Sequence, residues 1–162
     1  MPESWSSRFD RWRLNWFPAY RATGARITYI ADDWLEVRVR LPLTWRTRNY
    51  VGTIFGGSLY GAVDPIYMVM LIRALGPEYV VWDQAATIRF LRPGRSTLHA
   101  TFRLEPDTVA AMAADARVQG RITRDFQIEL RDGEGTVCFQ CTKTIHVRWK
   151  LAPREAGAAR GR

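Results

Sequence analysis

The sequence predicts an α+β domain in which a long antiparallel sheet curls around one central helix. Alternating apolar and charged residues mark strands along much of the chain, most clearly over residues 35–41. Residues 57–75 instead carry apolar side chains at helical spacing on nearly every face, which predicts a buried helix. Because no linker or internal repeat divides the 162 residues, we expect all of these elements to share one core.

The other elements follow from spacing and turn residues. Residues 5–17 have apolar side chains three or four apart and predict an extra N-terminal amphipathic helix, which Pro18 stops. Asp107 is the expected N-cap of an alanine-rich helix over residues 108–117. The expected strands lie at residues 25–30, 35–41, 79–91, 96–104, 120–130 and 136–149, the first two and the last two forming hairpins.

The composition, with 47% hydrophobic and 25% charged residues, is that of an ordinary globular domain. Charge or proline interrupts each apolar stretch before the roughly 18 to 20 residues of a membrane span. Glu3, Arg8 and Asp10 stand where a signal peptide would be apolar. We therefore expect a cytoplasmic protein with no membrane partner.

The formal net charge of +8 raises the possibility of a nucleic-acid partner. The excess lies at the two ends, with +3 over residues 1–26 and +4 over residues 148–162. The interior has no basic stripe of the kind that follows phosphates, which disfavours nucleic acid. We divide the chain into an N-terminal helix and lead-in (1–24), the sheet domain (25–150) and a disordered basic tail (151–162).

The two cysteines, Cys138 and Cys141, are three residues apart in a predicted strand and therefore point to opposite faces. We interpret them as buried residues without a role in zinc or redox chemistry, and we expect no metal.

The segment from Asn49 to Asp64 resembles a known family. The positions of Asn49, Gly52, Gly56, Gly57 and Asp64 are similar to the N-x-x-G-x-x-H-G-G…D signature of hotdog-fold acyl-CoA thioesterases, in the branch of the phenylacetyl-CoA thioesterases. The run F-L-R-P-G after the helix is similar to a strand end of that family. The runs D-P-I-Y-M and W-D-Q resemble a branch known as a domain of unknown function.

This resemblance implies a hotdog-fold homo-oligomer, dimer or tetramer, that hydrolyses an acyl-CoA or acyl-carrier thioester in a pocket at the subunit interface, without a cofactor. It also implies roles for three residues. The carboxylate of Asp64 is the general base or nucleophile, the backbone amide of Gly56 binds the oxyanion, and Asn49 orients the carboxylate or the water.

The residues themselves suit this chemistry. Thioester hydrolysis requires a group that activates water and N–H donors for the developing oxyanion. A carboxylate in an apolar helix that begins beside a Gly-Gly turn supplies both. If the helix starts near Gly57, Asp64 lies about two turns further on, and we expect it to flank the same end of the pocket as the glycine amides.

Asp64 has a purely structural interpretation as well. Aspartate followed by Pro65 is a favoured helix start, with the aspartate as N-cap. The functional interpretation instead requires Pro65 to kink a continuous helix, because proline removes one internal hydrogen bond.

Phe55 stands where the family has histidine, and phenylalanine cannot donate a hydrogen bond to a thioester oxygen. The only histidines, His99 and His146, lie in predicted strands and are not candidate bases. An alternative function is therefore a non-catalytic acyl-CoA or lipid binding module that retains the pocket.

Further candidates contact substrate. They are Phe55, Gly57 and Tyr60 along the pocket, and Arg89, Arg92 and Arg95 for the phosphates of coenzyme A. Asp83, Gln84 or Thr87 is expected to face the site of a second subunit. The 20 aromatic residues exceed what one small domain hides, and this excess also predicts oligomerisation.

Overall fold

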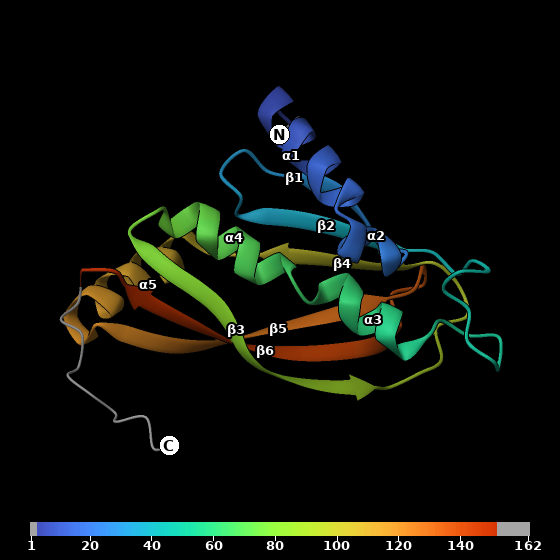
Figure 1. Ribbon diagram of the computed structural model, residues 1–162. Coiled ribbons are helices and arrows are strands. Elements are labelled where there is room, and N and C mark those ends of the chain that lie inside the picture. The colour runs from blue at the N-terminus through green and yellow to red at the C-terminus, as the bar shows by residue number, and fades with distance from the viewer. Residues whose placement is uncertain (1–2, 152–162) are drawn as a thin grey trace, which may run out of the picture.

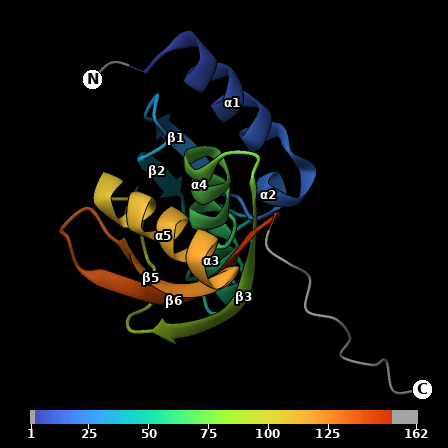
Figure 2. The same ribbon diagram turned by 90° about the vertical axis from the view of Figure 1, so that its left-hand side faces the viewer.

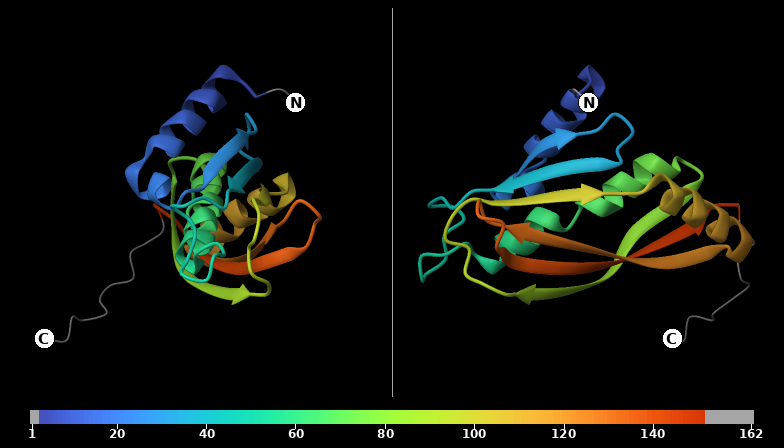
Figure 3. Two further views of the ribbon diagram at one scale, coloured as in Figure 1. Left: turned by 90° about the vertical axis from the view of Figure 1, so that its right-hand side faces the viewer. Right: turned by 180° about the vertical axis from the view of Figure 1, so that it is seen from behind.

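The computed structural model describes residues 3–151, and it has the predicted α+β architecture (Figure 1). One six-stranded antiparallel sheet, in the order β1-β2-β4-β5-β6-β3, curls around a central helical segment. Seen from behind, the strands form a single curved layer (Figure 3). The predicted tail lies outside the described residues except for residue 151, and the division at residues 24 and 150 stays a prediction.

The central segment consists of α3 (Gly56–Val63) and α4 (Ile66–Leu75) with a break at Asp64 and Pro65. Pro65 has no N–H to donate, but its carbonyl accepts the first bond of α4 from the amide of Val69 at 3.0 Å. The predicted kink is thus a short interruption between two helices. Met70 and Leu71 are fully buried, as an all-round apolar helix requires.

Both predicted hairpins are present. β1 (Arg26–Ile30) pairs with β2 (Glu36–Leu41), and β5 (Arg121–Arg131) pairs with β6 (Val137–Trp149). Their inward residues, such as Val37, Val39 and Leu41 at a spacing of two, supply a large share of the core.

The two strands that follow α4 are not neighbours. β3 (Tyr79–Phe90) pairs along β6 at one edge of the sheet, whereas β4 (Leu98–Arg103) lies between β2 and β5. The connection after β3 therefore crosses the end of the sheet. It leaves the outer edge of β3 without a strand partner within the described chain.

Two helix boundaries differ from the sequence prediction. Pro18 does end α1 (Trp5–Trp16), but it also begins a second helix, α2 (Pro18–Ala22), because proline suits the first helical turn. The predicted N-cap role of Asp107 is wrong. Pro106 opens α5 (Pro106–Gln119) for the same reason, so that Asp107 lies within the first turn.

The span Gly56–Leu75 is long and apolar enough to cross a membrane by length and composition alone. The sequence analysis expected charge or proline to interrupt every apolar stretch before that length, whereas this 20-residue span has a mean hydropathy of 1.3. Figure 2 shows this segment with the sheet curled around it. The sheet buries Met70 and Leu71 fully, and 44% of the apolar window is buried inside the molecule.

Candidate active site

Asp64 lies at the break between α3 and α4, where the chain turns away from its helical path. Its backbone N–H still bonds Tyr60 as the last link of α3. Its carboxylate accepts a hydrogen bond from the Lys143 ammonium at 2.6 Å, and the side chain remains 42% exposed. One side of the carboxylate is therefore held by a cation, and water can approach it.

This arrangement excludes the structural interpretation of Asp64 as an N-cap. Pro65 occupies the N-cap position of α4, and no side chain caps that helix. The Asp64 carboxylate instead interacts with a residue 79 positions away in the sequence. A bond to a distant strand indicates a site assembled by the tertiary fold.

Lys143 is the centre of the polar cluster. It projects from β6 into the core, its side chain has no exposed surface, and its ammonium also lies 3.1 Å from Asp83 and 3.3 Å from the Tyr60 hydroxyl. Burial by itself would lower the pKa of Lys143, but the hydrogen bonds to Asp64 and Asp83 outweigh it and raise the pKa. The ammonium of Lys143, set between two carboxylates, therefore fixes the position of Asp64.

Asp83 is the more enclosed of the two carboxylates, with its side chain 21% exposed. Burial raises its pKa, and the nearby Lys143 opposes that rise. Within the described residues, its Oδ1 is buried without a hydrogen-bond partner. Beside Asp83 the pairing of β3 with β6 shifts by one residue at Gln84.

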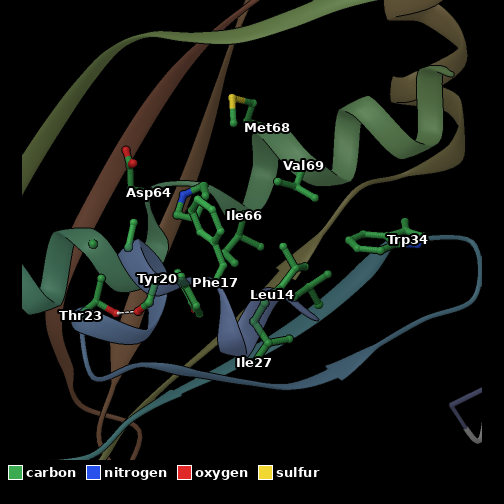
Figure 4. A pocket seen from close by; sticks show the side chains of 14 residues that line it. Leu14, Phe17, Tyr20, Thr23, Ile27, Trp34, Asp64, Ile66, Met68 and Val69 are labelled. Atoms are coloured by element: carbon green, nitrogen blue, oxygen red, sulfur yellow. Dashed lines mark hydrogen bonds between the residues drawn. The ribbon is translucent and has the colours of Figure 1, made fainter. Parts of the chain in front are cut away.

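An apolar cavity of about 320 Å³ opens next to Asp64. It lies between the helix break, the α1–α2 corner and the first hairpin, and its lining includes Leu14, Tyr20, Ile27 and Trp34 (Figure 4). The Asp64 carboxylate points away from Leu14 and Ile27 in this view. The cavity thus has a volume and lining suited to a small apolar group, with one carboxylate at its edge.

The glycines of the predicted oxyanion site form the first turn of α3, where backbone N–H groups have no helical acceptor. The Phe55 ring folds over this turn, and a Cβ on Gly57 would lie 2.4 Å from it. A Cβ on Gly56 would lie 3.2 Å from the Phe90 ring of β3. The lack of side chains therefore permits the close approach of two rings.

The expectation that Asp64 and these amides flank the same end of the pocket is wrong within one chain. Gly56 and Asp64 are separated by all of α3, about 12 Å at 1.5 Å per residue. A carbonyl oxygen in hydrogen-bonding contact with the amides is then out of reach of the carboxylate. A site that uses both groups requires two chains.

Asn49 does not contact Asp64. Its carbonyl oxygen accepts from the amides of Val51 and Thr53 at 3.1 and 3.0 Å, and its amide donates to the Thr53 hydroxyl at 2.9 Å. These bonds shape the loop before α3. Within one chain, Asn49 therefore supports the loop rather than the carboxylate.

The remaining candidates lie at two places. Tyr60 joins the Lys143 cluster, and burial together with its bond to Asp64 raises its pKa. Arg89, Arg92 and Arg95 are exposed along the end of β3 and the following turn, near the α3 N-terminus that Phe90 contacts.

Gln84 and Thr87 are exposed on β3, as candidates for facing a second subunit should be, whereas Asp83 belongs to the site of its own chain. The histidines lie apart from this cluster. His146 stacks on Trp82 with ring centroids 4.3 Å apart, and His99 is exposed on β4. Cys138 and Cys141 are buried free thiols, and residues 3–151 contain no group of three metal-ligating side chains.

Sequence reasoning missed Lys143, although the sequence carries a signal for it. Cys141, Lys143, Ile145 and Val147 alternate along β6 and are all fully buried. A lysine in an inward row of apolar residues requires an anionic partner. That requirement points toward the carboxylates of the central helix and the neighbouring strand.

The curled sheet around a central helix, with a carboxylate at the helix break, defines a hotdog-fold protein. The chain belongs to the family described as a domain of unknown function, DUF4442, whose model matches residues 6–147. The resemblance to a branch known as a domain of unknown function is thereby confirmed. A search of curated proteins found no match.

Solved structures of the same fold include proteins that carry a thioesterase name. The chain is similar to PA5026 of Pseudomonas aeruginosa, a probable thioesterase, with a TM-score of 0.78 at 19% identity, covering 88% of this chain and 95% of that one. Thioesterase HI1161 of Haemophilus influenzae superposes with a TM-score of 0.66 at 18% identity, over 94% and 97% of the two chains. The PaaI protein of the E. coli phenylacetic acid degradation operon gives 0.61 at 21% identity, over 88% and 91%.

Proposed function

We propose that this protein hydrolyses an acyl thioester, such as an acyl-CoA or acyl-carrier thioester, in a site shared by two subunits. The observation that carries the proposal is the Asp64 carboxylate, held by a buried lysine yet open to water beside an apolar cavity. The thioesterase names of PA5026 and HI1161, which have this fold, support the reaction class. A cytoplasmic location stays a prediction.

The unpaired edge of β3 supports the proposed pairing of two copies. Every residue from Gln84 to Phe90 is exposed, an unusual run for a strand of a packed sheet. An antiparallel pair of β3 strands related by a two-fold axis at Thr87, the middle of this run, would cover it. In that register Phe90 of each chain lies opposite Gln84 of the other.

This register would complete the site. Phe90 contacts the first turn of α3, and Asp83, next to Gln84, shares Lys143 with Asp64. Pairing at Thr87 therefore brings the Gly56 amide of one subunit toward Asp64 of the other. The 12 Å separation within a chain is then no obstacle.

Each group has a proposed role in the shared site. Asp64 takes a proton from water as the water oxygen attacks the thioester carbon, and the amides at the α3 N-terminus stabilise the oxyanion. Collapse of the intermediate breaks the carbon–sulfur bond, and the thiolate receives the proton from Asp64. Lys143 acts as a positioning residue, because it holds the carboxylate without an exposed surface of its own.

The substrate's two ends have different environments. The acyl group is proposed to enter the apolar cavity beside Asp64, which Gly61 and Ile66 line on either side of the helix break. Tyr60 lies beside Lys143, outside that lining. Arg89, Arg92 and Arg95 are proposed to contact the phosphates of coenzyme A, as exposed guanidinium groups near the α3 N-terminus.

A non-catalytic acyl-binding function remains the second candidate because of two observations. Phe55 supplies no hydrogen bond where the family has histidine. The Asp64 carboxylate also already accepts a hydrogen bond from the Lys143 ammonium at 2.6 Å, so one of its oxygens is occupied by a partner within the chain.

The test measures free thiol released from acyl-CoAs of increasing chain length. The Asp64→Asn variant is expected to bind substrate but to lose turnover by a factor on the order of 100 or more, as when a general base is removed. The pairing is tested separately with Thr87→Cys, which should form a disulfide-linked dimer, while Thr101→Cys on β4 serves as an exposed control. Binding of acyl-CoA without turnover at any chain length would instead support the binding module.

A further inference from the structure

The N-terminal helix α1 turns its aromatic side chains away from the rest of the molecule. Trp5, Phe9, Trp12 and Trp16 are each more than half exposed. At 3.6 residues per turn these four positions fall within an arc of about 60°. Figures 1 and 2 show α1 on the outside of the first hairpin, so this aromatic face of α1 has no covering element in the described chain.

Polar residues on the other faces of α1 fix this orientation. The Asn15 side chain bonds both backbone groups of Ile27 on the edge strand β1, at 2.8 and 2.9 Å. Ser7 donates to Asp32 at 2.9 Å, and Asp10 forms an ion pair with Arg73 of α4 at 2.9 Å. Since polar groups attach the helix to the domain, the outward direction of its aromatic face is built into the fold.

Arginines border the aromatic face on both sides. Arg8 and Arg13 lie about 40° beyond its two edges on the helix, and α2 adds Arg21 at its end. Their guanidinium groups lie over the rings of Trp5, Phe9 and Trp16, at 4.7, 5.9 and 4.4 Å from the centroids respectively. The acidic residues nearby, Glu3 and Asp10, pair with Arg11 and Arg73, which leaves the outer border positively charged.

We propose that the aromatic face of α1 docks on an anionic lipid surface. Tryptophan rings prefer the boundary between headgroups and acyl chains, and arginines beside them meet the lipid phosphates. A helix of low overall hydrophobicity with one aromatic face and cationic borders lies in the plane of such a surface. The cytoplasmic leaflet carries the negative charge that this face complements.

Other occupants fit the face less well. A second copy would bring the same three arginines, Arg8, Arg13 and Arg21, against their own counterparts across a two-fold axis, and like charges repel. Nucleic acid requires a continuous row of cations along the phosphates, whereas the centre of this face is a row of four aromatic rings. The expectation of no membrane partner was based on membrane spans and signal peptides alone. A helix that lies on a membrane surface is neither of these.

Docking would also place lipid beside the apolar cavity. A surface groove lined by Trp12 and Trp16, and bordered by the charged residues Asp10, Arg13 and Arg73, adjoins the cavity next to Asp64. The groove and the cavity share the apolar residues Leu14, Phe17, Trp34 and Val69. An apolar chain that leaves the lipid surface at the aromatic face would therefore enter the cavity past these shared residues. This consequence is separate from the docking itself.

The experiment is sedimentation of the full chain with sucrose-loaded vesicles of phosphatidylcholine alone or with about one third phosphatidylserine. We expect binding to the anionic vesicles that weakens with salt. Trp12→Ser with Trp16→Ser should abolish it. Replacing Arg8, Arg13 and Arg21 by Gln should weaken partitioning roughly 100-fold, at about fivefold per arginine.

The loop before the central helix offers a matched control. Trp45 is 80% exposed and Arg46 lies over its ring at 4.8 Å, the same kind of pair as on α1. Trp45→Ser with Arg46→Gln should leave vesicle binding unchanged, and thermal unfolding should show that all variants are folded. Absence of binding by the folded wild type, or equal binding by the α1 variants, would overturn the proposal.

Two other results would assign the face differently. Loss of an oligomer in the Trp12→Ser, Trp16→Ser variant without any effect on vesicles would identify a second copy as the occupant. Salt-sensitive RNA binding that depends on the three arginines, with no vesicle binding, would identify nucleic acid. Either result overturns docking on lipid, and neither bears on thioester hydrolysis, which is assayed with soluble substrate.

Discussion

The central helical segment and the N-terminal helix have similar sequence signatures but opposite orientations. Both carry apolar residues three or four positions apart. In α4, Met70 and Leu71 are enclosed by the sheet, whereas in α1, Trp12 and Trp16 face outward and Asn15 faces the domain. Helical spacing therefore identifies an apolar face, but the polar contacts of the other face decide whether it meets the core.

The largest loss of folding stability is expected on removal of Lys143, the β6 residue that binds Asp64 at the break of the central segment. Lys143→Met removes the only cation within hydrogen-bonding distance of Asp64 and Asp83 among the described residues. Removing the buried cation leaves the enclosed Asp83 carboxylate without its partner, a loss of up to about 3–5 kcal/mol. Chemical denaturation should show this loss, and adding Asp83→Asn should restore part of it. If Lys143→Met and Asp83→Asn changed the free energy of unfolding additively, the two side chains would not be energetically coupled.

A slightly smaller loss of folding stability is expected when a buried apolar side chain of α4 is shortened. Leu71 has no exposed surface, and Leu71→Ala should lower the free energy of unfolding by about 2–5 kcal/mol through lost burial and a new cavity. Thermal and urea unfolding measure it. A change below about 1 kcal/mol would mean that the sheet encloses α4 less tightly than the structure shows.

The attachment of α1 is the next test. Asn15→Ala removes both side-chain bonds to Ile27 and exposes the edge of β1 to water. A loss of about 1–2 kcal/mol follows from two backbone groups that exchange a protein partner for solvent. Faster hydrogen exchange of the Ile27 amide should accompany it, while the amides of α4 stay protected. Equal acceleration in both regions would show that α1 and the core unfold as one unit.

The raised pKa of Asp83 should make the folding stability depend on pH. Its pKa is raised above the ordinary 3.8, so the folded state holds the proton to higher pH than the unfolded state. Stability attributable to Asp83 should therefore fall as pH rises from about 3.8 through the folded-state pKa, and stay constant above it. The difference between the wild-type and Asp83→Asn unfolding profiles isolates this fall. A difference independent of pH would show that Asp83 is not enclosed.

The sequence predicts most of the fold because local patterns determine it. Alternation along residues 35–41 and the spacing in residues 57–75 specify a strand and a helix whatever lies beside them. The site depends on contacts between distant residues, and the 79 positions between Asp64 and Lys143 leave no local pattern. Asn49 illustrates the converse, since its motif position is recognisable but its bonds to Val51 and Thr53 are set by the loop.

The smallest effect is expected on the outer face of α1. Trp12 is a larger side chain than Leu71, yet it is 56% exposed, and its ring pairs with Phe9 and Trp16 of the same helix, at centroid distances of 6.1 and 6.3 Å. Trp12→Ala should therefore change the free energy of unfolding by no more than about 0.5 kcal/mol, and the better helix propensity of alanine offsets part of the lost ring contact. Comparison with Leu71→Ala distinguishes the effect of burial from that of side-chain size. Leucine is smaller than tryptophan, yet its replacement should cost more free energy of unfolding because Leu71 is buried. A loss of 2 kcal/mol or more on Trp12→Ala, measured by urea unfolding below the concentration at which copies associate, would mean that the aromatic face of α1 packs within its own chain.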